Sequence, residues 1–177
     1  MVLRKRAGSK RSSGDIDGAL ADLQMAMDLG MADTPDAVLA WVRIQQNNDR
    51  WAETIPVLRQ TLVQFPAHVA LLTAYARASV RTQDREAYEE ALTKLKATEG
   101  GRPLALVMEA EVKYEQASAR QDQALRDEAM TMFEEVIDLT DRLATPFYYR
   151  GRYLAEKQRA FKDAIVEYDK AIARDAD

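Results

Sequence analysis

Apolar residues recur along this chain at spacings of three and four, which place them on one face of an α-helix. The clearest case is the set Phe161, Ala164, Ile165, Tyr168, Ala171 and Ile172. Another expected helix precedes this set and contains Gly151. A glycine costs a helix about 1 kcal/mol relative to alanine. Its presence therefore predicts that a second helix passes close to residue 151.

The same helical pattern recurs four more times, each time as a small residue followed four positions later by a larger apolar one. The small residues are Ala19, Thr54, Ala91, Ala129 and Ala164, at intervals of 35, 37, 38 and 35. The larger residues are Leu23, Leu58, Leu95, Phe133 and Tyr168. A small side chain lets two helices approach, and the larger one fills the groove beside it. The pattern predicts five consecutive helix pairs.

This organisation resembles the tetratricopeptide repeat (TPR) family, in which a helix–turn–helix unit recurs about every 34 residues. The resemblance implies an all-α, right-handed helical solenoid of about five repeats. We expect a single domain over residues 1–177, with approximate repeats 1–33, 34–67, 68–101, 102–143 and 144–177. Each hairpin then buries its apolar face against its neighbours in a continuous seam. We assign to this seam Trp41, Trp51, Tyr75, Tyr88, Tyr114, Phe133 and the seven methionines.

Two boundaries in the C-terminal half are expected from local sequence. The second helix of the fourth repeat is predicted over residues 125–141. Thr145 and Pro146 are expected to lead into the first helix of the last repeat. Proline favours positions at or before the first turn of a helix because it has no backbone N–H to donate.

In TPR proteins the first helices of successive repeats line a concave surface that often binds extended peptides. By this resemblance, equivalent inward positions hold Arg43, Arg77 and Arg152. Neighbouring inward positions hold Leu39, Gln46, Asn47, Thr73, Arg81 and Tyr148. Arginines one repeat apart can bind carboxylates bidentately. The alternative is that they pair with acids of adjacent helices and bind nothing. Ala40 and Ala74 occupy positions where some chaperone-binding TPR domains carry asparagine, which argues against that particular clamp.

Composition narrows the function classes further. The chain has a net charge of −4, an apolar fraction of 47% and no cysteine, so disulfides and thiolate chemistry are excluded. No apolar run is long enough to cross a bilayer, and we expect a cytoplasmic protein without a secretory leader. The single histidine, His68, lies at a predicted helix start and is interpreted as a surface or capping residue. No phosphate-binding loop, nucleophile elbow or metal-binding motif occurs. We therefore predict no enzyme activity, cofactor or metal.

The N-terminal segment suggests other hypotheses. Residues 1–13 contain five basic residues and no acidic one. They fit a poor first helix of repeat one, or a basic arm that binds nucleic acid or another anionic surface. Nucleic acid is the less favoured partner because one short basic run is weak evidence. The favoured function is a non-catalytic scaffold that binds a protein or peptide, with an acidic segment as the expected ligand. A third hypothesis is a fragment of a longer array that forms a homodimer through an uncapped end.

Overall fold

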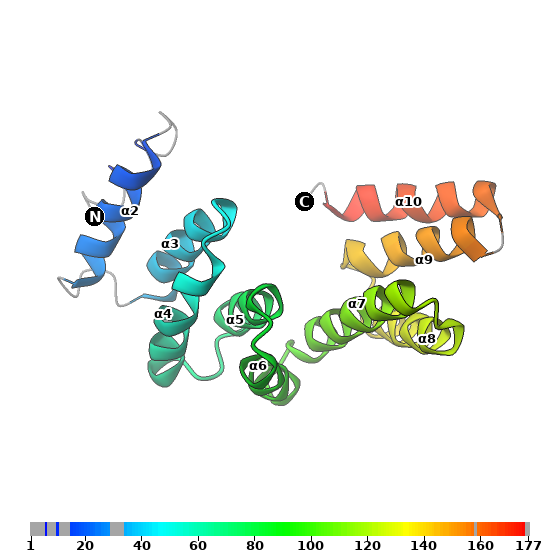
Figure 1. The fold of residues 1–177 in the computed structure, drawn as a ribbon, viewed down its shortest axis with the longest axis horizontal. Helices are drawn as coiled ribbons and strands as arrows, with labels where there is room; N and C mark the ends of the chain where they lie inside the picture. The colour runs from blue at the N-terminus through cyan, green and yellow to red at the C-terminus, as the bar shows by residue number, and fades with distance from the viewer. Residues whose placement is uncertain (1–5, 7–9, 11–14, 29–33, 158, 176–177) are drawn as a thin grey trace. The chain divides into compact units, whose positions relative to one another are not determined.

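The computed structural model describes residues 6, 10, 15–28, 34–157 and 159–175. Over residues 15–175 of this described part the chain forms nine α-helices and no strand (Figure 1). The helices are α2 (Ile16–Asp28), α3 (Pro35–Asn47), α4 (Trp51–Gln64), α5 (Val69–Thr82), α6 (Arg85–Ala97), α7 (Arg102–Arg120), α8 (Gln123–Leu139), α9 (Ala144–Lys157) and α10 (Phe161–Asp175). The predicted all-α class is confirmed. The expected first helix of repeat one lies, apart from Arg6 and Lys10, outside the described residues.

The helices group into two compact units, Met1–Gly101 and Arg102–Asp177. Unit 1 contains α2 to α6, and unit 2 contains α7 to α10. Within each unit every helix packs against the next one in sequence, and in unit 1 α3 also contacts α5. The break falls where the sequence places the boundary between the third and fourth repeats. A single continuous solenoid would require the two units to stack on each other, and it stays a prediction.

The turns inside the hairpins share one backbone feature. A residue with positive φ lies between α3 and α4, between α5 and α6, between α7 and α8, and between α9 and α10. These residues are Asp49 (58°), Gln83 (59°), Gln121 (54°) and Arg159 (50°). The left-handed conformation ends the first helix of each pair and reverses the chain. None of the four is a glycine, so each turn is formed at a cost in backbone energy.

Side-chain caps fix several helix starts. The Asp84 and Asp122 carboxylates each accept a hydrogen bond of 3.0 Å, from the backbone N–H groups of Ala87 and Leu125. His68 Nδ1 accepts a longer one, 3.4 Å, from the Leu71 N–H, which confirms its predicted capping role. The cap at Asp122 explains why α8 spans Gln123–Leu139, two residues earlier than predicted.

The start of α9 also differs from the prediction. The helix begins at Ala144, so Thr145 and Pro146 belong to its first turn and do not precede it. The first turn tolerates proline because its N–H groups have no partner within the helix.

The repeated small residue is buried in all five of the helices that carry it, α2, α4, α6, α8 and α10. The exposed fraction is 0% for Ala19, Thr54, Ala91 and Ala129, and 2% for Ala164. The expected contact at Gly151 is also confirmed. A Cβ atom there would lie 2.8 Å from Tyr168 Cε1 and 3.1 Å from the Ala164 carbonyl oxygen. Both residues belong to α10, so the missing side chain is what allows α9 and α10 to pack.

Two expectations about the apolar seam need correction. Met108 and Met130 are buried, but Met25 is 52% exposed on α2 and does not belong to the core. On α10 the six apolar residues do not act as one buried face. Ala164 and Ala171 pack inward, whereas Phe161, Ile165 and Ile172 are exposed. Spacing identifies a shared face of the helix, but the width of that face exceeds what α9 covers.

Candidate partner-binding surface

The predicted binding residues of unit 1 lie on α3 and α5 in matching positions. Residues 39, 43 and 47 of α3 correspond to residues 73, 77 and 81 of α5, 34 positions later. These residues are exposed or half-buried, and we call them, together with Gln46, the α3/α5 surface: Leu39, Arg43, Gln46, Asn47, Thr73, Arg77 and Arg81. The two helices contact each other directly, so the matching positions form a continuous strip on one unit.

Three residues of the α3/α5 surface already have intramolecular partners. Gln46 Nε2 donates to the Ala74 carbonyl, 3.4 Å away, which links α3 to α5. The Thr73 hydroxyl donates to its own helix at the Val69 carbonyl. The Arg81 guanidinium lies 5.4 Å from the centre of the Trp51 ring, a cation–π distance. These contacts stabilise the surface and leave fewer groups available to a ligand.

Within the described part of the chain, Arg43 and Arg77 lack the intramolecular contacts that Gln46, Thr73 and Arg81 form. Both side chains are exposed, and neither forms an ion pair or side-chain hydrogen bond with another described residue. Helix α5 contains no acidic residue, and the single acid of α3, Asp36, lies two helical turns before Arg43. The strip therefore carries three positive charges, of Arg43, Arg77 and Arg81, without a neutralising carboxylate from its own helices.

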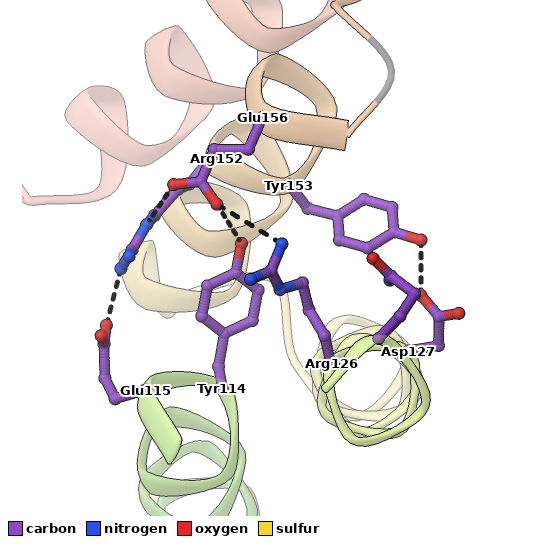
Figure 2. A network of polar contacts seen from close by, with 8 residues as sticks. Tyr114, Glu115, Arg126, Asp127, Arg152, Tyr153 and Glu156 are labelled. Atoms are coloured by element: carbon purple, nitrogen blue, oxygen red, sulfur yellow. Dashed lines mark hydrogen bonds and ion pairs between the residues drawn. The ribbon is translucent and has the colours of Figure 1, made fainter. Parts of the chain in front are cut away.

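In unit 2 the predicted residue Arg152 is neutralised by its own chain. Figure 2 shows its guanidinium between two carboxylates: Nη1 lies 2.6 Å from Glu115 of α7, and Nε lies 2.8 Å from Glu156 of α9. The Arg152 guanidinium also lies 5.1 Å from the centre of the Tyr114 ring. Partial burial acts to lower the pKa of Arg152, but the hydrogen bonds to Glu156 and Glu115 outweigh it and raise that pKa. This arginine is a structural link between α7 and α9.

The same network fixes the aromatic residues around Arg152. Tyr114 is fully buried and donates to Glu156 at 3.4 Å. Burial raises the pKa of Tyr114 to about 12, and the neighbouring Glu156 carboxylate adds to the effect. Tyr149 donates to Glu115 at 3.1 Å. The predicted residue Tyr148 is 47% exposed and lies edge-on to Tyr149, with ring centres 5.2 Å apart.

Arg126 and Asp127 extend the network in Figure 2 to α8. Arg126 lies 3.9 Å from Glu156, and the Tyr153 hydroxyl donates to Asp127 at 2.7 Å. Glu115, which binds both Arg152 and Tyr149, was not among the residues predicted from sequence. One signal was present: Glu115 follows Arg77 by 38 residues, the same interval that separates Ala91 from Ala129.

The nine predicted binding residues are thus divided between the units, seven on the α3/α5 surface and two on α9. The structure brings the seven together within one unit. Near the N-terminus, Arg6 and Lys10 both contact the buried carboxylate of Asp22. The remaining basic residues of the N-terminal segment, Arg4, Lys5 and Arg11, lie outside the described residues.

Comparison with solved structures defines the class of fold as TPR-like and all-α. One crystal structure of MamA, a TPR-like helical protein, matches with a TM-score of 0.63 and 16% identity, over 96% of this chain and 94% of that chain. Another crystal structure of MamA matches with a TM-score of 0.65 and 16% identity, over 99% and 91%. The sequence matches no protein-family model and no curated protein. At this identity the likeness establishes the fold.

No helix in the described part of the chain combines the length and the apolar character needed to span a membrane. The described residues also contain no group of three or more His, Asp or Glu side chains arranged to hold a metal ion.

Proposed function

We propose that this protein is a non-catalytic interaction scaffold and that it binds an acidic segment of a partner protein on the α3/α5 surface. The TPR-like fold supports the scaffold role, because stacked helix pairs present a large preformed surface. The observation that carries the proposal is the contrast between the two units. Arg152 of unit 2 is paired with Glu115 and Glu156, whereas Arg43 and Arg77 of unit 1 have no carboxylate partner among the described residues.

Electrostatics favours an anionic ligand at this place. Two arginines on packed helices repel each other weakly, and two ligand carboxylates remove that repulsion while each accepts two parallel hydrogen bonds from one guanidinium. Exposed ion pairs contribute only about 0–1 kcal/mol each. Arg43 and Arg77 therefore supply orientation and selectivity, and contacts with Leu39 and the small side chains beside Thr73 supply further affinity.

The geometry of the surface sets the spacing of the ligand. Packed helices lie about 8–10 Å apart, and an extended polyproline II chain advances about 3.1 Å per residue and presents every third side chain on the same face. A peptide that crosses α3 and α5 would therefore present one carboxylate to each arginine when its acidic residues are three positions apart. The proposed ligand is an extended segment with Asp or Glu at positions i and i+3.

Selection from a displayed library of random peptides tests this proposal even though the partner is unidentified. We expect enriched peptides to carry the i, i+3 acidic pair, and their labelled forms to bind the wild-type protein in fluorescence anisotropy. The R43E/R77E variant should bind about tenfold or more weakly, a loss of roughly 1.4 kcal/mol or more. Enrichment without acidic residues, or equal binding by the variant, would contradict the proposal.

A matched control separates the α3/α5 surface from net charge. Arg85 on α6 and Arg120 at the end of α7 are both exposed and lie outside this surface. R85E/R120E lowers the net charge from −4 to −8, the same change as R43E/R77E. We expect the control variant to bind like the wild type at physiological salt, because dissolved ions screen the interaction between exposed charges beyond about 8 Å.

A further inference from the structure

Helix α10 exposes a stripe of large apolar side chains. Phe161, Ile165 and Ile172 are 61%, 58% and 68% exposed, and their spacings of four and seven place them along one side of the helix. Tyr168 lies on the same side and is half-buried against Tyr148. We call these four residues the α10 stripe. Exposed contiguous apolar surface of this kind marks interaction sites.

Two other second helices, α8 and α4, each bury an apolar side chain at an equivalent position. Ile165 follows the small residue of its repeat, as Met130 does in α8, and Met130 is 6% exposed. Ile172 lies eight positions after the small residue, as Leu62 does in α4, and Leu62 is 3% exposed. The next helix in sequence packs against each of these earlier helices. The α10 stripe thus has the character of a packing face, and it is exposed.

The side of α10 that adjoins the stripe already fixes the helix in unit 2. Ala164 and Ala171 are buried, and α10 packs closely against α9. Glu167 lies on this buried side and forms ion pairs with Arg150 at 2.6 Å and with Lys170 at 2.8 Å. The exposed members of the α10 stripe, Phe161, Ile165 and Ile172, are therefore not needed to hold the hairpin together, and substitutions at these three positions should leave the fold intact.

The charges beside the stripe point to a particular occupant. Lys162 and Asp169 are exposed, lie one position after Phe161 and Tyr168, and follow the same edge of the stripe seven residues apart. Neither forms an ion pair with a described residue. If a second α10 packs antiparallel, Phe161 meets the partner's Ile172 and Ile165 meets the partner's Tyr168. The two-fold symmetry then places Lys162 near the partner's Asp169, and the reverse pair forms at the other end.

We propose that the α10 stripe is a self-association surface, through which two copies of this chain form an antiparallel α10–α10 dimer. The apolar residues drive the contact, and the Lys162–Asp169 pairs select the antiparallel register. Each copy carries both the positive and the negative member of the charge pair, Lys162 and Asp169, so a second copy is complementary to the stripe. A single helix pair is a small interface, so the dimer dissociates on dilution.

Sedimentation equilibrium over a range of protein concentrations tests the apolar part. We expect a reversible monomer–dimer equilibrium for the wild type. I165E should raise the dissociation constant by about a hundredfold or more, because each copy would bury a carboxylate in the interface. The matched control is V166E: Val166 is 50% exposed but lies about 100° around the helix from Ile165. A wild type that stays monomeric, or equal effects of I165E and V166E, would overturn the proposal.

Charge exchange tests the register and distinguishes a second copy from a different partner. K162D and D169K each replace two attractive pairs by like charges, and each should weaken the dimer by between about threefold and thirtyfold. The double variant K162D/D169K restores opposite charges across the interface and should recover wild-type association. Failure of the double variant to recover would refute the antiparallel pairing.

Disulfide cross-linking reads the register directly, because the wild-type chain has no cysteine. In the proposed pairing, the two copies of residue 172 lie about 16 Å apart along the axis, too far for a disulfide. F161C and I172C proteins should therefore cross-link to each other when mixed and oxidised, and neither should cross-link to itself. Efficient self-cross-linking of I172C would contradict the register.

Discussion

At the scale of single residues, Gly151 determines how closely α9 and α10 pack. We predict that G151A destabilises the protein by about 1–2 kcal/mol, because the new methyl group would meet Tyr168 and the backbone oxygen of Ala164 at 2.8 and 3.1 Å. Urea unfolding followed by circular dichroism measures this change. Helix propensity alone predicts the opposite sign, a gain of about 1 kcal/mol. The control A155G, on the same helix, should show only the propensity cost. A stabilised G151A protein would contradict the close approach.

Glu167 gives the structure a predictable response to acid. Its burial opposes ionisation, but hydrogen bonds from Lys170 and Arg150 outweigh this and lower the pKa of Glu167. A lowered pKa means that the ionised form favours folding, so this contribution is present above the pKa of an unfolded glutamate, about 4.3, and is lost as the pH falls through the folded value.

We therefore predict that E167Q lowers the free energy of unfolding by about 1–3 kcal/mol at pH 7. The difference between the two proteins should shrink as the pH falls below about 4. Urea titrations of both proteins between pH 3 and pH 7 measure it. A difference that stays constant over this range would show that Glu167 does not act through its charge.

At the scale of the helix pair, the turn with one left-handed residue is the recurring element. Gln83 has φ of 59° and ends α5, while its backbone N–H bonds to the last turn of that helix. We predict that Q83G stabilises the hairpin by up to about 1 kcal/mol, since glycine adopts this conformation without a Cβ clash. Q83V should destabilise it, because branched side chains tolerate positive φ poorly. Thermal unfolding of the two variants against the wild type decides between these signs. Equal effects would contradict the turn geometry.

The helix pairs were predictable from sequence because the small residue must be buried for two helices to approach. That requirement repeats in every pair, so Ala19, Thr54, Ala91, Ala129 and Ala164 reveal the period whatever the turns between them. Helix ends were less predictable. The start of α8 depends on the Asp122 side chain binding the Leu125 N–H, and the start of α9 on a proline accepted in its first turn.

At the scale of the whole molecule, the candidate site could be predicted only in part. Spacing identified the exposed strip of α3 and α5 because both helices keep the 34-residue period. In unit 2 the longer α7 obscures the register, so Glu115 was missed as the partner of Arg152. The exposure of the α10 stripe was equally hidden, since apolar spacing alone does not tell how wide a face the neighbouring helix covers.

The central proposal for the whole molecule is that the α3/α5 surface selects carboxylates. It rests on the TPR-like fold and on Arg43 and Arg77 of unit 1, which are unpaired among the described residues. A charge exchange across the complex tests it most directly. The peptide selected by the wild-type protein is compared with a version in which both acidic residues are lysines, and each is titrated into wild-type and R43E/R77E protein.

We predict that the wild type binds the acidic peptide and R43E/R77E the lysine peptide, with each mismatched pair weaker by about tenfold or more. A lysine peptide that binds neither protein, together with an acidic peptide that binds both equally, would contradict carboxylate selection by the α3/α5 surface.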